Sequence, residues 1–139
     1  MTNITSELRA SLENAPYPNL LGFRLLELTE GCAKTAVTIR PEHANFLGAT
    51  DGCLVMSLAD YAFASSTNTL GATRVALQEN IHFVATAPSK GELVAEARAV
   101  HVGKIIAVMD MSVTDDTRRI IAKATGTAIT RPNQSSATK

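Results

Sequence analysis

The sequence predicts a single α+β domain in which a curved antiparallel β-sheet wraps around one long central helix. Three observations lead to this prediction: an early pair of strands, a long apolar segment with helical spacing within residues 45–71, and four strand-like segments after it. A chain of 139 residues has the size of one domain. We place the domain at residues 1–131 and expect the polar tail, residues 132–139, to be disordered.

The segments before the central helix are a short helix and a β-hairpin. Apolar residues recur at every fourth position from Ile4 to Leu12, which predicts a short amphipathic helix that ends before Pro16. Residues 23–40 form two strand-like runs that meet at a Glu-Gly pair, residues 30–31, in the manner of a hairpin. The hairpin supplies the first two strands of the sheet.

The central helix is predicted to be buried over most of its circumference. Asp60 interrupts this pattern, because it lies on a stripe of small, apolar or hydroxyl side chains. An aspartate is a poor helix former and an unpaired buried charge is costly, so its carboxylate requires a partner or a solvent-filled groove. Asp60 is therefore a candidate functional residue, and the alternative is an exposed or structural aspartate. The stripe of Asp60 comprises Cys53, Met56, Ser57, Ala64 and Thr67, and the buried stripes comprise Leu54, Val55, Leu58, Ala59, Tyr61, Ala62 and Phe63.

Four strand-like segments follow the helix and are separated by turn residues. We expect them to form a four-stranded meander. In the second segment Leu93, Ala95 and Ala97 share one face, which indicates that one side of the sheet is covered. The segments are residues 74–86, 92–102, 104–114 and 118–130.

Charge and motifs exclude several classes of function. The 13 basic and 13 acidic residues balance without a block of like charge, which argues against nucleic acid or a membrane surface as a partner. No signal peptide and no apolar run of roughly 20 residues is present, so we expect a cytoplasmic protein. Glycine-rich phosphate loops are absent and the histidines are isolated, so neither a nucleotide cofactor nor a metal is expected. Cys53 has no neighbouring base and is interpreted as a packing residue.

The segment around Asp60 resembles a known family. Asn45, Gly52 and the run SLADYAFA at residues 57–64 are similar to the hotdog-fold acyl-CoA thioesterases of the PaaI-like (phenylacetate-degradation) group. In that family the helix opens with His-Gly-Gly after an upstream Asn or Gln and continues into Leu-Ala-Asp. The resemblance covers nearly the whole chain and implies a hotdog fold with Asp60 as the catalytic carboxylate. Further similarity lies in residues 20–23, 80–92 and 100–104.

Two positions depart from the family pattern at the start of the helix. Asp51 stands where the family has its histidine, and Cys53 stands where it has its second glycine. An aspartate directly before a helix is a good N-cap, which accepts hydrogen bonds from the amides of Cys53 or Leu54. Asp51 also places a negative charge beside the Gly52 amide, which is the donor expected to stabilise an oxyanion.

The resemblance implies an enzyme that hydrolyses a small or medium acyl-CoA or aryl-CoA, with CoA as part of the substrate and no other cofactor. Asp60 would be the general base or the nucleophile, the Gly52 amide the oxyanion donor, and Asn45 a residue that positions substrate or water. Gly52 and Asp60 are eight residues apart, about 12 Å along a helix, which is too far for both to contact one carbonyl. Each site is therefore expected to combine two subunits of a homodimer, which could pair further into a tetramer. The residues expected to contact the substrate are Asp51, Cys53, Met56 and Ala64.

Other interpretations stay open at the level of sequence. A hotdog protein that binds an acyl-CoA without catalysis is the first alternative, because the altered position Asp51 adjoins the expected oxyanion donor. A hydratase or dehydratase would need a histidine beside a carboxylate, and the central helix contains none. A structural interaction module is the third. The nearest candidates for a polar residue facing Asp60 are Thr73 and Gln78, and the basic residues that could meet CoA phosphates are Arg74, Lys90, Lys104 and Arg118.

Overall fold

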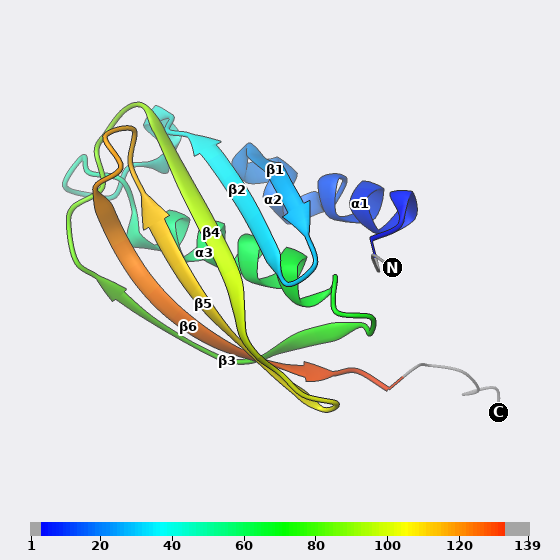
Figure 1. Cartoon of the computed structure of the whole chain (residues 1–139). Coiled ribbons are helices and arrows are strands. Elements are labelled where there is room, and N and C mark those ends of the chain that lie inside the picture. The colour runs from blue at the N-terminus through cyan, green and yellow to red at the C-terminus, as the bar shows by residue number, and fades with distance from the viewer. Residues whose placement is uncertain (1–3, 133–139) are drawn as a thin grey trace, which may run out of the picture.

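The computed structural model describes residues 4–132 and shows a six-stranded antiparallel sheet curved around one long helix (Figure 1). This confirms the predicted α+β class. None of the helices in the described range is long and apolar enough to cross a membrane. The helices are α1 (Ser6–Glu13), α2 (Pro16–Leu21), the 3-10 helix η1 (Pro41–His43) and α3 (Gly52–Thr67). The strands are β1 (Phe23–Thr29), β2 (Cys32–Thr38), β3 (Arg74–Phe83), β4 (Glu92–Val102), β5 (Ile106–Thr114) and β6 (Ile120–Thr130).

The N-terminal segment contains the predicted helix α1 and a second short helix, α2, which the sequence did not predict. The sequence predicts only a helix end at Pro16, but this residue occupies the first position of α2, where the missing N–H of proline costs nothing. Gly22 ends α2 in the left-handed conformation, with φ of 79°. The Tyr61 hydroxyl donates a hydrogen bond to the Leu12 carbonyl at 2.8 Å, which docks the end of α1 on α3.

The order of strands in the sheet is β1-β2-β4-β5-β6-β3. The hairpin β1–β2 is confirmed, whereas the predicted four-stranded meander is wrong for its first strand. Strands β4, β5 and β6 do form a meander, but β4 pairs with β2, and β3 pairs with β6 at the far edge. The reason is visible in burial: β4 buries alternate side chains and suits the centre, while β3 exposes most of its residues and suits an edge.

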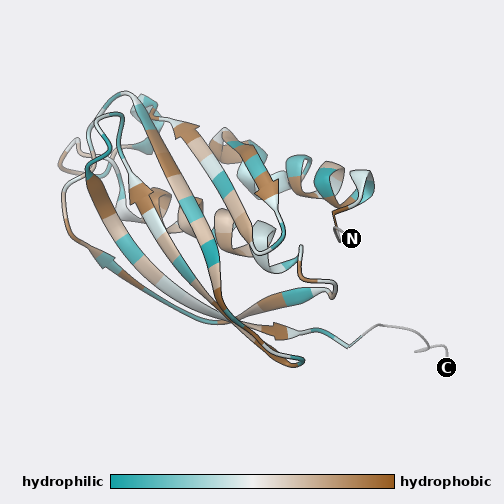
Figure 2. Cartoon of the chain, viewed as in Figure 1, coloured by the Kyte–Doolittle hydropathy of each residue, from teal (hydrophilic) through white to brown (hydrophobic). Residues whose placement is uncertain are grey.

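Helix α3 packs its predicted apolar stripes against the concave face of the sheet, over β2, β4 and β5 (Figure 1). Hydrophobic and hydrophilic residues alternate along the central strands, as Figure 2 shows, which is the pattern of a sheet covered on one face. Phe63 of α3 lies directly against Gly126 of β6, where an added Cβ would stand 2.6 Å from a ring carbon. A residue without a side chain therefore sets how closely the helix approaches β6.

Strand β3 contains a β-bulge, with Leu77 as the extra residue opposite β6. Beyond the bulge, Glu79 pairs with Gly126 and Ile81 pairs with Ala124. Both of these partners lie on the buried face of β6. The bulge therefore shifts the alternation of β3 by one residue and turns Glu79 toward α3.

Candidate functional site

The start of α3 presents an unused backbone donor. Asp51 is the N-cap, and its carboxylate accepts a hydrogen bond from the Cys53 amide at 2.7 Å, as predicted. The Leu54 amide donates to the Asp51 carbonyl. Within residues 4–132, the amide of Gly52 has no recorded acceptor. This amide is therefore a free donor at the positive end of the dipole of a 16-residue helix.

The loop before α3 is held in place by two polar side chains. The side-chain carbonyl of Asn45 accepts hydrogen bonds from the amides of Leu47 at 2.9 Å and Ala49 at 3.1 Å. The Thr50 hydroxyl donates to the carbonyl of Pro88 at 2.5 Å, which joins this loop to the segment between β3 and β4. Asn45 therefore uses its oxygen for the loop, and its side-chain NH₂ has no recorded acceptor in the described chain.

A pocket of 440 Å³ lies between this loop, the start of α3 and the end of β3. Asn45 and Gly52 both line it, so the structure brings these two predicted site residues together. Phe83 forms part of the wall, and a Cβ added to Gly52 would lie 3.5 Å from its ring. The lining residues are Asn45, Leu47, Ala49, Thr50, Gly52, Val55, Phe83, Val84, Ala85, Thr86, Ala87 and Ile121. An apolar cavity with few polar groups is typical of a site for the acyl part of a ligand.

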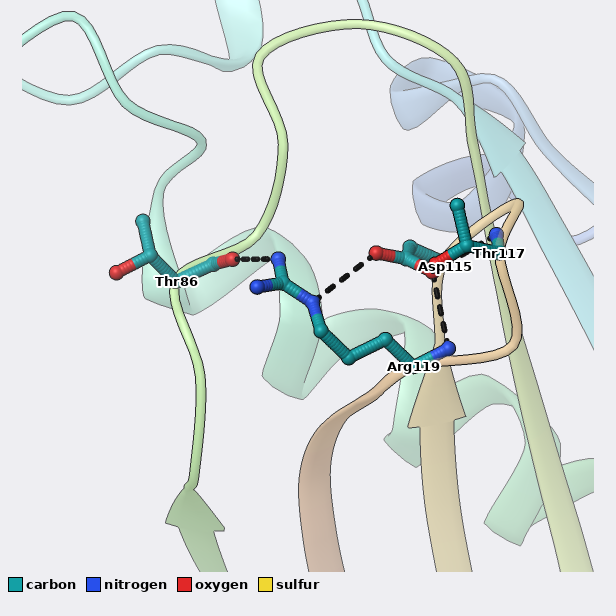
Figure 3. Close-up of polar contacts among 4 residues, drawn as sticks. All are labelled: Thr86, Asp115, Thr117 and Arg119. Carbon is teal, nitrogen blue, oxygen red and sulfur yellow. Dashed lines mark hydrogen bonds and ion pairs between the residues drawn. The ribbon is translucent and has the colours of Figure 1, made fainter.

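Arg119 fixes the wall of this pocket that runs through residues 84–87 (Figure 3). Its guanidinium donates to the Thr86 carbonyl at 2.9 Å and to the Asp115 carboxylate at 3.3 Å. Asp115 in turn accepts hydrogen bonds from the Thr117 hydroxyl and from the amides of Thr117 and Arg119. These bonds, the one from the Thr117 hydroxyl first, keep the pKa of the Asp115 carboxyl below its ordinary value. The turn between β5 and β6 therefore holds the chain segment that closes the pocket.

Asp51 and Cys53 line a different pocket, of 210 Å³, on the side of helix α2. The structure therefore separates them from the pocket of Gly52, although all three residues are adjacent in sequence. The Asp51 carboxylate is occupied by its N-cap bond and does not line the Gly52 pocket. The predicted contacts of Asp51 and Cys53 with substrate stay predictions.

Asp60 lies on the partly exposed stripe of α3, eight residues from Gly52, and does not line the Gly52 pocket. Met56 and Ala64 share this stripe, as predicted, and are likewise partly exposed. Burial raises the pKa of the Asp60 carboxyl, and a hydrogen bond with Glu79 opposes that rise. The carboxylate singled out by the sequence therefore faces a second carboxyl group.

Sequence reasoning missed Glu79. The pKa of its side chain is raised to about 7, first by burial, then by the charge of Asp60 and by their shared hydrogen bond. The neighbouring Gln78, one of the two residues considered opposite Asp60, pairs with Thr127 and takes the other face of the sheet. Only the bulge at Leu77 distinguishes these two placements, and bulges leave a weak signal in sequence.

The basic residues considered for CoA phosphates occupy different ends of the sheet. Arg74 is buried and donates to the carbonyls of Gly103 and Ile105, so its guanidinium serves the fold. Lys90 and Arg118 are exposed, in the connections at the end of the sheet where the Gly52 pocket lies. Within residues 4–132, no group of three or more His, Cys, Asp or Glu side chains could hold a metal ion.

Comparisons with known proteins identify relatives of this chain. The family model of the thioesterase superfamily matches residues 43–122, which span the pocket, α3 and β3. A putative esterase of Archaeoglobus fulgidus is 37% identical over 108 residues, covering 78% of this chain and 70% of that protein. The acyl-coenzyme A thioesterase PaaI of Escherichia coli is 29% identical over 113 residues, covering 81% of each protein. The solved structure of the E. coli PaaI protein from the phenylacetic acid degradation operon is similar with a TM-score of 0.85, covering 89% of this chain and 90% of that one at 27% identity.

Proposed function

The chain belongs to the thioesterase superfamily, in its PaaI-like group with the hotdog fold, and is a thioester hydrolase; we propose that its substrate is a small or medium acyl-CoA or aryl-CoA. The single observation that carries this proposal is the free Gly52 amide at the base of an apolar pocket. A thioester carbonyl that enters this pocket meets a backbone donor and a helix dipole, and both favour the negative charge that develops on its oxygen.

The acyl group is proposed to occupy the apolar pocket, with its carbonyl oxygen at Gly52. Asn45 lines the same pocket, and its side-chain NH₂ is proposed to orient the substrate or the attacking water. The CoA part of the bound substrate would extend toward solvent, where Lys90 and Arg118 are exposed at this end of the sheet. These two cations are candidates for the phosphates of CoA.

Asp60 is proposed to act on the substrate held by another subunit. Within one chain Asp60 lies two turns along α3 from Gly52 and outside its pocket. Strand β3 is an edge strand with exposed apolar side chains, among them Val75 and Leu77, which supports pairing with the β3 of a second copy. Such a homodimer would also cover the partly exposed stripe of α3 and place Asp60 against its partner's pocket. Pairing of two such dimers into a tetramer is compatible with this arrangement.

In the reaction, water adds to the thioester carbonyl carbon while Asp60 accepts its proton. The carbon–sulfur bond then breaks, and the sulfur leaves with that proton as the free thiol of CoA. In the alternative course, Asp60 itself attacks the carbonyl carbon, and the carbon–sulfur bond breaks to expel the CoA thiolate, which takes a proton from solvent. Water then hydrolyses the resulting anhydride and restores the Asp60 carboxylate. Both courses develop negative charge on the carbonyl oxygen, so both depend on the Gly52 amide.

The variant Asp60→Asn tests this proposal. It keeps the size of the side chain and removes both the base and the nucleophile, so we expect kcat to fall by about 10²–10⁴-fold. Release of free thiol from a panel of short-chain, medium-chain and aryl acyl-CoAs is the measurement, with binding of the same compounds and the oligomeric state measured in parallel. Unchanged turnover in a folded Asp60→Asn dimer would remove Asp60 from the mechanism. Binding of acyl-CoA by the wild type without thiol release from any member of the panel would contradict the proposed substrate class.

A further inference from the structure

We propose that Glu79 is a positioning residue for Asp60: as a neutral carboxylic acid it donates a hydrogen bond to the Asp60 carboxylate, so that the two groups share one proton and one negative charge. The pairing itself is a property of the fold. Its consequence for catalysis rests on the proposed function of Asp60.

The backbone brings the two groups together. The bulge at Leu77 turns Glu79 toward α3, and its register partner on β6 is Gly126. Gly126 is also the residue against which Phe63 packs, and Phe63 lies one turn after Asp60 on the same side of α3. Helix α3 and strand β3 thus approach each other here, and the side chains of Asp60 and Glu79 are hydrogen-bonded to each other.

The hydrogen bonding of Glu79 requires a proton within the pair. Its Oε1 atom is buried and has no donor among the described residues. Two ionised carboxylates cannot hydrogen-bond, and a buried polar atom without a partner is costly. A proton on one carboxyl group satisfies both requirements, because the O–H of one acid then donates to the other carboxylate.

No cation among the described residues takes the place of that proton. On α3, the other titratable groups are Cys53 at its start and Tyr61, whose hydroxyl is bonded to Leu12. On β6, the positions beside Gly126 are the uncharged Thr125 and Thr127. The titratable side chains His82, Asp110 and Lys123 line a pocket on the opposite face of the sheet. The pair therefore resembles two carboxyl groups that share a site, one of which stays protonated.

The direction of the pKa values assigns the proton to Glu79. Burial is the first cause of the raised pKa of both groups, but the hydrogen bond lowers the pKa of Asp60 and raises that of Glu79, to about 7. Their hydrogen bond thus favours the anion on Asp60, one of whose oxygens is held by Glu79. The other oxygen is left to accept the proton of water or to attack the carbonyl, while the proton of Glu79 stays in place throughout the reaction.

A first experiment detects the shared proton without any substrate. Infrared spectra record the carbonyl band of protonated carboxyl groups, and the difference between wild type and Glu79→Gln isolates the contribution of Glu79. We expect a band that disappears with a midpoint near pH 7 in the wild type. In Asp60→Asn the midpoint should move to lower pH, because the charge that raises the pKa of Glu79 is gone. Glu7→Gln, on the exposed face of α1, is the matched control and should leave the band unchanged.

A second experiment measures the role of Glu79 in turnover. In the wild type we expect kcat to fall above pH 7, as Glu79 loses its proton. Glu79→Gln keeps an N–H donor at every pH, so its kcat should stay within about fivefold of the wild type and should not fall above pH 7. Glu79→Leu has no donor, so we expect kcat at neutral pH to fall by about 10–100-fold with little change in KM. The acidic side of the kcat–pH profile of Glu79→Leu should also move to higher pH, because Asp60 loses the hydrogen bond that lowers its pKa. Circular dichroism and the oligomeric state confirm that each variant is folded.

The two experiments separate this inference from the proposed function. Absence of a Glu79-dependent band near neutral pH, or a wild-type pH profile in both Glu79 variants, would overturn the shared proton even if Asp60→Asn is inactive. A band that behaves as expected in a protein whose Asp60→Asn variant turns over normally would retain the pair and reject its catalytic use.

Discussion

The free amide of Gly52 can be deleted without disturbing the helix it begins. Gly52 is the first residue of α3, a position that proline favours, and its amide donates to no recorded acceptor in the described chain. Asp51 has φ of −65° and ψ of 137°, which is the conformation preferred before proline. Gly52→Pro therefore keeps the helix start and removes the donor, with the proline Cδ in place of the amide hydrogen. Loss of one oxyanion donor typically costs about 10²–10³ in kcat, or about 3–4 kcal/mol of transition-state stabilisation, and we expect a loss in this range.

Gly52→Ala is the matched control, because it adds a methyl group at ordinary contact distance, 3.5 Å from the Phe83 ring, and keeps the N–H. Its kcat should stay within about fivefold of the wild type. The assay is thiol release under saturating acyl-CoA, with circular dichroism to confirm that α3 is intact. Wild-type kcat in a folded Gly52→Pro protein would refute the assignment of this amide as the oxyanion donor.

The same variant tests whether a site spans two subunits. In a randomly exchanged equal mixture of Gly52→Pro and Asp60→Asn subunits, about half of the dimers are mixed, and each mixed dimer has one site with both groups intact if the site spans subunits. About one quarter of wild-type activity should then return, whereas a site contained within one subunit would recover none.

Two further predictions concern the support of the site. Asp51→Ala should lower the free energy of unfolding by about 1 kcal/mol because the N-cap bond to Cys53 is lost, whereas Asp51→Ser should keep it; urea denaturation distinguishes the two, and equal losses would contradict the capping role. Gly126→Ala should destabilise the fold by about 1–3 kcal/mol because its methyl group would overlap the Phe63 ring; the double variant with Phe63→Leu should recover part of this loss in the same measurement, and simple additivity of the two changes would argue against the contact.

The parts of the fold that sequence predicted are those in which local pattern and burial agree. Helix α3 and the stripe of Asp60 followed from helical spacing, and β4 followed from strict alternation in Leu93, Ala95 and Ala97. The position of β3 did not follow, because pairing with β6 instead of β4 depends on burial relative to all the other strands. Helix α2 was missed since Pro16 marks a helix start as well as a helix end.

The sequence named candidate site residues but not the groups that surround them. Asp60 was singled out from the helical pattern, and Asn45 and Gly52 from the resemblance. The structure places Asn45 and Gly52 at one pocket and Asp60 outside it. Glu79 escaped because alternation counted from the start of β3 turns it away from the helix, and one extra residue reverses that count. A one-residue change of phase is a property of strand pairing, which a single sequence does not display.

The position of the bulge also restricts how the proposed dimer can form. Glu79 and Phe83 lie on the same face of β3, and Phe83 covers Gly52. If two β3 strands pair in antiparallel fashion around a two-fold axis, directly opposite residues lie about 5 Å apart and share a face. A register that sets Glu79 opposite Phe83 of the second copy would bring Asp60, which is bonded to Glu79, toward the partner's pocket. That register centres the two-fold axis near Ile81, which lies midway between Glu79 and Phe83. The bulge at Leu77 then lies outside the central segment, residues 79–83, in which the two strands pair.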